Sequence, residues 1–485
     1  MYRILLLLIF LLITLTSSFT QTFEKYISSD KDDIAHDAIE LDGPQYIILS
    51  QKNASEYGPQ DYEIKVYKID NTGDFIDSLE IAIDDDYMLS NTRYIFELIG
   101  NDLVIVGTCR NRITSDLQLY LAFLNTDLKF LKDTILGDSK LSDHNIDFLI
   151  NEFGNIIIGG FCENPTDDNN IIICEYNPNT EVFRRKAHSI QHVSINTIVE
   201  LPEINAYQAQ FVFNGDDILQ INRDSLSIDT LLQVSPNFDP GLALNIPGKN
   251  NYVVFGKKGN YSSGVAELAF RVMSISGEIL EEHTYGVQDT NCFFMYNEAD
   301  CKDSSYLYLG GTHNFTWYPP FLTPERRWIY INKLRLDGSI IWQHFYKGEL
   351  NYMPYKVLAT SDGGALILSH KYDWNSPYPD QRDIHILKVD SNGYYSGMVN
   401  LDEVSQKPLQ ILVYPNPAST TLNIATGHYS GLDFILFNLQ GKEVLRQKLH
   451  GSMHTISVDH LPPAIYIYRF YHDRQLLETS KIVIQ

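Results

Sequence analysis

The sequence has 485 residues, which is too long for one ordinary hydrophobic core and predicts two or more domains or a repeat architecture. Aromatic residues make up 12% of the chain, a composition that suits β-strands better than helices. The formal net charge of −24 argues against a nucleic-acid partner, because such partners require a basic protein surface.

The N-terminus has the pattern of a secretory signal peptide. Arg3 precedes an apolar run, Ile4 to Leu15, and the small and polar residues TSSFTQ follow. The run is shorter than the roughly 20 residues that span a bilayer. We therefore expect residues 1–20 to be a signal peptide. We expect no transmembrane segment in the mature chain, because no second long apolar run follows.

A pair of apolar strands recurs along the chain, and the first strands of the pairs start 45 to 59 residues apart. The first strands are predicted at 45–51, 102–109, 155–162, 206–213, 251–258, 305–312 and 364–371. The second strands are predicted at 62–70, 117–125, 170–178, 216–224, 266–274, 326–337 and 382–390. A polar loop of variable length separates the two strands of each pair.

Tight turns connect second strands to third strands. They read DNTGD at Asp70–Asp74, DGS at Asp337–Ser339 and DSNG at Asp390–Gly393. An Asp side chain caps such a turn by accepting backbone N–H groups, and Gly adopts the positive φ that the turn requires. Each unit therefore reads as four strands with tight, long and tight connections, most clearly between Tyr355 and Met398.

Units of this kind predict an all-β fold, a seven-bladed β-propeller over residues 21–401. Six or eight blades are also allowed, because the strand at 206–213 carries Gln at two positions. A stack of separate sandwiches is the alternative. The even period disfavours it, since each unit can bury both faces only between neighbours. The units resemble the loosely defined repeats of secreted propellers, a likeness that implies architecture and leaves activity open.

The end of the chain breaks this pattern. Residues 402–408 (DEVSQKP) read as a linker, and residues 409–485 form a series of short alternating strands that suits a small immunoglobulin-like β-sandwich. Its landmarks are the turn Tyr414-Pro415-Asn416-Pro417, Gly441 at a later turn, and Tyr466 in the closing strand. The two prolines fix the backbone before the first strand and limit pairing at its edge.

These landmarks, in this order, resemble the type A C-terminal sorting domain of type IX secretion cargo. The chain departs from the family at Pro463-Ala464, where the family usually has Gly before the Ile-Tyr of the closing strand. The resemblance implies transport through the outer-membrane type IX secretion machinery to the cell surface or medium. The segment carries six Lys and Arg and five Asp and Glu, so its charge of about +1 leaves about −25 for the body. An accessory immunoglobulin-like module without a transport role is the alternative.

The body lacks short catalytic motifs. It has no G-x-S-x-G, no H-E-x-x-H, no P-loop and no dinucleotide fingerprint. The acidic runs at Asp84–Asp86 and Asp167–Asp168 lack the spacing and central Gly of a calcium loop. His188 and His192 would share a metal only on a helix, and this region reads as strands. The sequence therefore predicts no catalytic residue, no metal site and no cofactor.

All four tryptophans fall within residues 317–374, and two of them occupy the long connections of the sixth and seventh units. Trp317, Tyr318, Trp374 and Tyr378 are the candidate ligand-binding residues, because flat aromatic faces beside polar groups suit sugar rings or an apolar patch of a partner. The alternative is that these rings pack down and close the two loops.

Five cysteines in an exported chain allow disulfides and leave one thiol over. Cys292 and Cys301 bracket one loop and form the candidate bridge, with Cys162 and Cys174 as a second plausible pair. Simple buried cysteines are the alternative.

These patterns lead to two hypotheses about the body. It is either an exported, non-enzymatic propeller that binds a glycan or a surface protein, or a secreted propeller that hydrolyses or eliminates polysaccharide. The second requires two carboxylates at a fixed separation, and sequence alone cannot select them among 61 acidic residues.

Overall fold

The computed structural model describes the chain from residue 21 to its end with several gaps, and the described residues fall into two compact units, residues 1–399 and 400–485. The described ranges are 21–53, 62–90, 93–137, 142–163, 169–189, 195–212, 216–234, 238–260, 265–286, 292–293, 297–315, 326–373, 376, 381–396, 412–414, 416–425, 431–449, 453–472 and 475–485. The predicted signal peptide and linker lie outside them.

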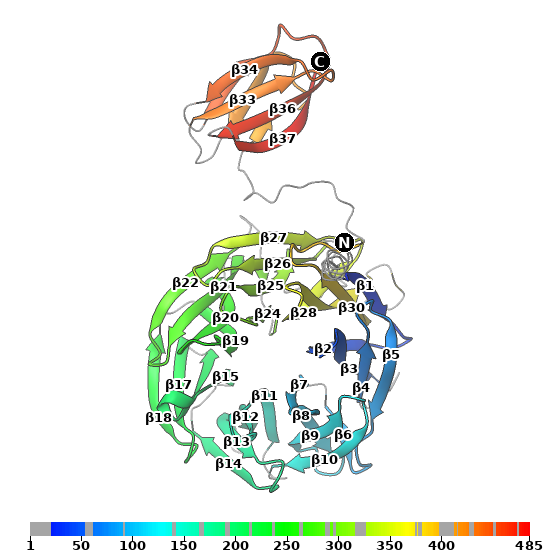
Figure 1. Ribbon diagram of the computed structural model, residues 1–485, viewed down its shortest axis with the longest axis vertical. Coiled ribbons are helices and arrows are strands. Elements are labelled where there is room, and N and C mark those ends of the chain that lie inside the picture. The colour runs from blue at the N-terminus through cyan, green and yellow to red at the C-terminus, as the bar shows by residue number, and fades with distance from the viewer. Residues whose placement is uncertain are drawn as a thin grey trace, which may run out of the picture. The chain divides into compact units, whose positions relative to one another are not determined.

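The first unit, called the body here, is built from antiparallel sheets arranged around a centre (Figure 1). Its first sheet joins two groups of four strands. The first group is β2 (Asp33–Leu41), β3 (Gln45–Asn53), β4 (Tyr62–Ile69) and β5 (Phe75–Ile81). The second is β7 (Ile95–Ile99), β8 (Asp102–Asn111), β9 (Leu117–Asn125) and β10 (Phe130–Leu136). The short strand β6 (Tyr87–Leu89) pairs with both β4 and β8 and joins the groups.

Three four-stranded sheets follow in chain order. The first holds β11 (Ser142–Ile150), β12 (Ile156–Glu163), β13 (Asn169–Tyr176) and β14 (Phe183–His188). The second holds β15 (Ile195–Leu201), β16 (Ala206–Val212), β17 (Asp216–Asn222) and β18 (Ile228–Val234), with the 3-10 turn η1 (Pro202–Ile204) after β15. The third holds β19 (Phe238–Asn245), β20 (Asn251–Asn260), β21 (Val265–Ser274) and β22 (Ile279–Tyr285).

The last two sheets of the body complete the ring. One holds β23 (Cys292–Phe293), β24 (Ala299–Asp300), β25 (Leu307–His313), β26 (Trp328–Leu334) and β27 (Ile340–Tyr346). The other holds β28 (Asn351–Ala359), β29 (Ala365–Tyr372) and β30 (Arg382–Val389), and its fourth strand is β1 (Phe23–Ile27) from the other end of the body. Phe23 pairs with Lys388 and Ile27 with Ile384, so the N-terminal strand closes a propeller-like ring.

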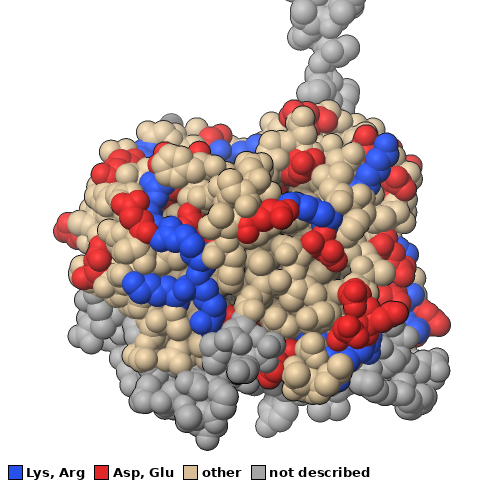
Figure 2. All heavy atoms as spheres, turned by 90° about the horizontal axis from the view of Figure 1, so that it is seen from below, with Lys and Arg blue, Asp and Glu red and all other residues tan. Residues whose placement is uncertain are grey.

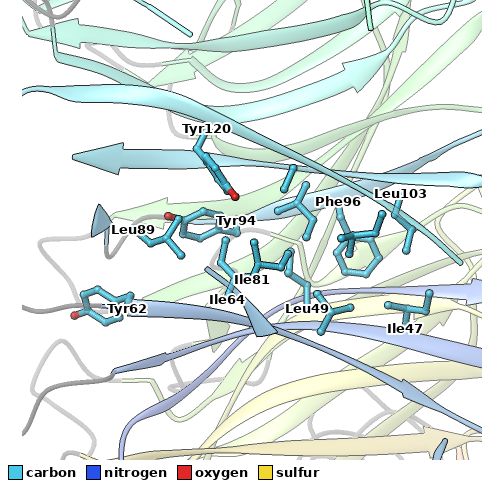
Figure 3. Close-up of a cluster of buried hydrophobic side chains, with 14 of the residues drawn as sticks. Ile47, Leu49, Tyr62, Ile64, Ile81, Leu89, Tyr94, Phe96, Leu103 and Tyr120 are labelled. Atoms are coloured by element: carbon cyan, nitrogen blue, oxygen red, sulfur yellow. The ribbon is translucent and has the colours of Figure 1, made fainter. Parts of the chain in front are cut away.

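Neighbouring sheets bury their side chains against each other. Successive residues of a strand point to opposite faces, and β3 shows the consequence. Ile47 and Leu49 pack toward the second group, in the cluster that Figure 3 draws, whereas Tyr46 and Ile48 pack toward the sheet that contains β1. Each strand of this kind therefore contributes to two hydrophobic clusters, which explains why its sequence is continuously apolar rather than alternating.

The capped turns have the predicted chemistry. Asp70 Oδ1 accepts the N–H groups of Thr72 and Asp74 at 2.8 and 2.9 Å, and Gly73 has a φ of +79°. Asn125 Oδ1 caps the equivalent turn between β9 and β10, a role that the sequence pattern of Asp turns did not predict. An amide oxygen accepts the same backbone N–H groups as a carboxylate, which explains the substitution.

The second unit is a small all-β domain with two sheets. One holds β31 (Leu412–Tyr414), β32 (Thr421–Ala425) and β35 (Met453–Ser457). The other holds β34 (Glu443–Leu449), β33 (Leu432–Phe437), β36 (Ala464–His472) and β37 (Gln475–Ile484), in that order. Side chains from both sheets, including Leu422, Phe434 and Ile482, form one buried cluster.

The cysteines differ from the predicted bridges. Cys292 and Cys301 are buried thiols rather than a disulfide, and both contribute to the hydrophobic cluster around β20 and β25. Cys162 and Cys174 are also buried thiols. In the sheet register, Cys162 lies opposite Asn170 and Cys174 opposite Ile158, so the two are not cross-strand partners. The alternative of simple buried cysteines describes all four.

Candidate functional site

The predicted aromatic platform lies outside the described residues, since Trp317, Tyr318, Trp374 and Tyr378 all fall in the gaps. The residues that follow these loops are fixed by contacts. The backbone N–H of Arg327 donates to Asn351 Oδ1 at 2.9 Å, and the Arg382 Nε donates to Asp32 Oδ1 at 2.8 Å. Asn351 is the first residue of β28 (Asn351–Ala359), and Asp32 lies in the link between β1 and β2.

The centre of the ring holds polar groups that the sequence did not single out. The strands nearest the centre in Figure 1 are β2, β7, β11, β15, β19, β24 and β28. Five of them share a shift in register. It lies between Ala35 and Asp37, Asn145 and Asp147, Ile195 and Thr197, Pro240 and Leu242, and Pro354 and Lys356. A β-bulge re-aims the side chain that follows it, so the same position is redirected in all five strands.

The side chain after the bulge binds the next sheet around the ring. In three strands it accepts a hydrogen bond from a backbone N–H of the neighbouring inner strand. The contacts are Phe96 N–H to Asp37 Oδ2 at 3.4 Å, Ile198 N–H to Asp147 Oδ2 at 3.0 Å, and Ala243 N–H to Thr197 Oγ1 at 2.7 Å. Asp37, Asp147 and Thr197 are all buried. These side chains therefore connect neighbouring inner strands that share no backbone ladder.

Two further carboxylates accept a backbone N–H from the next inner strand, at other junctions of the ring. Glu97 in β7 accepts a hydrogen bond from the backbone N–H of Ile150 in β11. Asp300 in β24 accepts one from Ala359 in β28, over 2.7 Å. Lys356 then joins the last inner strand to the first, because its ammonium lies 2.8 Å from Asp37 Oδ1. The inward-facing charges thus form a chain of contacts between neighbouring sheets.

The electrostatics of this group are unusual at Glu97. Glu97 belongs to the inner strand β7, and its side chain is exposed. Desolvation raises the pKa of Glu97 to about 7, and the carboxylates of Asp147 and Asp37 add to the rise. Burial also raises the pKa of Asp147, with Arg93 opposing the shift. A carboxyl that titrates near neutrality has the property of a general acid or base.

Two histidines near the same strands are buried and neutral. Burial lowers the pKa of His36 and of His370 to about 3. His36 Nε2 lies 3.2 Å from Gln51 Oε1, and the backbone N–H of Ala35 donates to His370 Nε2 at 3.1 Å. Over the part of the chain that the structure describes, no group of three His, Cys, Asp or Glu residues is arranged to hold a metal ion.

Of the histidine pair His188 and His192, the structure describes only the first. His188 lies in strand β14, where its Nε2 is 2.8 Å from the carbonyl oxygen of Leu226. His192 lies outside the described residues. The spacing of the two would bring them together only on a helix.

The predicted sorting motif has a structural role in the second unit. Tyr414 ends β31, and Pro415 lies outside the described residues. Asn416 Oδ1 accepts the backbone N–H of Val483 at 3.0 Å, so the motif is fixed to the last strand. Beyond Pro417, the N–H of Ala418 donates to the carbonyl oxygen of Val483 at 2.8 Å. The motif therefore covers one end of the open edge of β37.

The other two landmarks also fit their predicted places. Gly441 has a φ of +78° in the turn between β33 and β34, a conformation that favours glycine. Tyr466 is buried in β36, and its hydroxyl donates to the carbonyl oxygen of Pro462 at 2.8 Å. This bond fixes the Pro-Pro-Ala loop where the sequence departs from the family pattern.

Comparison with known proteins identifies the second unit. Residues 412–485 match the family described as "Secretion system C-terminal sorting domain". The match confirms the predicted sorting domain, and this domain indicates export by type IX secretion to the cell surface or medium. Type IX cargo status implies contact with the secretion machinery. Within the described ranges, no helix is long and apolar enough to cross a membrane.

Three solved structures illustrate what the chain is similar to in fold. No curated protein matches the chain. A copper-bound fungal alcohol oxidase of the AA5 family is 10% identical, with 95% of this chain and 99% of that chain covered and a TM-score of 0.42. The Swd1 β-propeller domain of Myceliophteria thermophila is 9% identical, with 76% and 99% covered and a TM-score of 0.45. PorZ, a type IX secretion component of Porphyromonas gingivalis, is 9% identical, with 93% and 81% covered and a TM-score of 0.26. Scores at this level support no argument about function.

Proposed function

We propose that the body is a seven-bladed β-propeller that works outside the cell as a non-enzymatic binding protein for a glycan or a surface protein. In this proposal β2–β5 is the first blade, and β28–β30 with β1 is the seventh. A signal peptide at residues 1–20 takes the chain across the inner membrane. The tail is an immunoglobulin-like sandwich, and the secretion machinery reads it and exports the chain.

One observation favours a binding function of the body over a catalytic function. Asp37, Glu97, Asp147 and Asp300 each accept a backbone N–H from the next group of strands around the ring. A carboxylate that holds two blades together is already oriented by that bond, so its presence at the centre needs no substrate to explain it. In this proposal the side chains at the centre of the ring have a structural role, and the loops and the outer surface contact the ligand.

The surface of the body suits an extracellular binding protein. Figure 2 shows Asp and Glu side chains distributed over one face, with Lys and Arg side chains among them. Mixed charge of this kind keeps a protein soluble. The aromatic residues Trp317 and Trp374 remain candidates for ligand contact on the long loops.

A polysaccharide hydrolase or lyase is the second candidate, and Glu97 favours it. Its pKa of about 7 is the value that a general acid needs at neutral pH, and Asp147 and Asp37 lie near enough to influence it. The two candidates differ in whether the polymer is cut.

The test uses the full chain without residues 1–20 and a panel of polysaccharides and glycoproteins. Retention on a polymer and release of new reducing or unsaturated ends are recorded together, for the wild type and for Glu97→Gln. Retention without new ends supports the binding protein. New ends that disappear in Glu97→Gln would establish the enzyme instead.

A further inference from the structure

A groove opens at the outer rim of the body where the ring closes. Its walls come from the end of β1, from β4 and from β5, which lie together on one side of the ring in Figure 1. The lining residues are Tyr26, Ile27, Ser28, Tyr67, Phe75, Ile76, Asp77 and Ser78. The cavity volume is about 420 Å³, within the range of small-ligand sites.

The lining combines exposed rings with hydrogen-bonding groups. Phe75 is 52% exposed and Tyr26 is 42% exposed, although both are large aromatic residues. The ring of Tyr67 lies 5.6 Å from that of Phe75 and is tilted by 57° to it, so one wall carries two adjoining aromatic rings. Asp77 adds a carboxylate, and Ser28 adds a hydroxyl. Aromatic faces next to a carboxylate and hydroxyls match the apolar faces and the hydroxyl edges of sugar rings.

At two other outer junctions between sheets, a side chain of one sheet hydrogen-bonds to the backbone of the next. The Tyr285 hydroxyl donates to the carbonyl oxygen of Gly338 at 2.7 Å, and Trp342 Nε1 donates to that of Ser391 at 2.9 Å. At the junction between β1 and β5, an ion pair closes one end, where Lys25 Nζ lies 2.7 Å from Asp74 Oδ1.

Next to that ion pair, the rings of Tyr26 and Phe75 line the groove. The chain therefore leaves aromatic side chains exposed to water where comparable junctions are filled. Exposed aromatic residues gathered in a concavity are typical of a binding site rather than of an ordinary surface.

We infer that this groove binds a neutral carbohydrate chain. The inference rests on the proposed extracellular binding function and places the ligand at the rim instead of on the Trp loops. The carboxylate of Asp77 favours a neutral sugar, because it accepts hydrogen bonds from hydroxyl groups and repels acidic ones. Two lysines stand near these rings: Lys65 Nζ is 5.3 Å from the Tyr67 ring centre, and Lys371 Nζ, which pairs with Asp383, is 4.8 Å from the Tyr26 ring centre.

Binding at this place would strengthen the closure of the ring. β1 is held in its sheet by β30, and it comes from the opposite end of the body from its partner. A ligand that contacts both Tyr26 and Phe75 connects β1 to the first group of strands. It binds the closed ring and not the open one, so it raises the melting temperature.

The structure offers a closely matched control for Phe75. Phe75 is the first residue of β5 and pairs with Ile69, and Phe130 is the first residue of β10 and pairs with Leu124. The two side chains are 52% and 44% exposed. Replacing either removes an exposed ring from an outer strand, and only Phe75 lines the groove.

The test is affinity electrophoresis of the full chain without residues 1–20 in gels that contain neutral glucan, mannan, galactan or xylan. For the retarding polymer we expect Phe75→Ala and Asp77→Ala each to weaken binding about fivefold or more, as lost ring stacking and hydrogen bonds imply. Phe130→Ala should bind like the wild type. The melting temperatures of all variants, without sugar, verify folding.

The outcomes test the groove and the proposed binding function separately. Retardation that survives Phe75→Ala and Asp77→Ala but is lost in Trp317→Ala/Trp374→Ala would overturn the groove and keep the binding function. Retardation by none of the four polymers would overturn the carbohydrate inference and leave a protein partner for the proposed function. Equal losses in Phe75→Ala and Phe130→Ala would also contradict the groove.

Discussion

The ammonium of Lys356 lies 2.8 Å from the carboxylate of Asp37, and this ion pair joins the last inner strand of the body to the first. Asp37 is 2% exposed, and it also accepts the N–H of Phe96 in the following group. One carboxylate thus contacts both of its neighbours around the ring. The contribution of Asp37 and of the equivalent groups to the free energy of unfolding can be measured.

Removing Lys356 should destabilise the body strongly. Lys356→Ala leaves the Asp37 carboxylate buried without its counter-ion, a change that typically costs about 3–5 kcal/mol. Lys356→Met with Asp37→Asn removes both charges and should recover much of the loss. Urea unfolding monitored by tryptophan fluorescence measures both variants. A single Lys356→Ala variant as stable as the wild type would show that the pair does not hold the ring closed.

Asp147 should matter in the same way at another junction. Asp147→Ala leaves the N–H of Ile198 and the hydroxyl of Thr197 without this acceptor, at a cost of about 1–3 kcal/mol. Asp85→Ala, on an exposed turn, is the control and should change stability by no more than about 0.5 kcal/mol. Similar unfolding midpoints for the two variants would contradict the role assigned to Asp147.

Glu97 predicts the pH dependence of stability. Its folded pKa is raised to about 7 from an ordinary value of 4.5, so between these pH values the folded state binds more protons than the unfolded state. The Glu97 contribution to stability therefore falls as pH rises from about 4.5 to 7. Glu97→Gln should remove that part of the slope. The measurement is the melting temperature of both proteins across this pH range, and parallel curves would contradict the raised pKa.

Asn416 should support export through the fold of the tail. Asn416→Ala removes the acceptor for the N–H of Val483 and should lower tail stability by about 1 kcal/mol. Asn416→Asp keeps the acceptor oxygen but loses the Nδ2 donor to the carbonyl oxygen of Lys481 at 3.3 Å, so comparison with Asn416→Ala separates the two hydrogen bonds. The fraction of protein outside the cell reports the effect in the native host. Deletion of residues 409–485 should abolish export, and continued export of that truncated chain would contradict the sorting role.

The sequence predicted the parts of the fold whose signals are local. The apolar run at 45–51 became β3, and the Asp70 turn has the capping bonds that its residues imply. β1 was not predicted. Its five residues form a strand by pairing with β30, which lies near the other end of the body in the sequence. Strands that are so far apart in the sequence can pair without any local sequence pattern that predicts the pairing.

The inner polar groups were missed for a similar reason. Asp37 and Lys356 are single charged residues in unremarkable contexts, and the ring closure alone brings them together. The groove residues Tyr26 and Phe75 come from strands that meet through the same closure. By contrast, the sorting domain was recognisable because Tyr414, Asn416 and Gly441 act within one short segment. The predicted Trp platform remains a prediction.

The central claim is that the exported body binds its ligand without changing it. The most direct measurement incubates the full chain, without residues 1–20, with a retained oligosaccharide at saturating concentration. The sugar is then recovered and its mass spectrum recorded. The account predicts that the oligosaccharide returns with its original mass. Shortened or unsaturated products, absent from a Glu97→Gln sample, would contradict it and identify an enzyme.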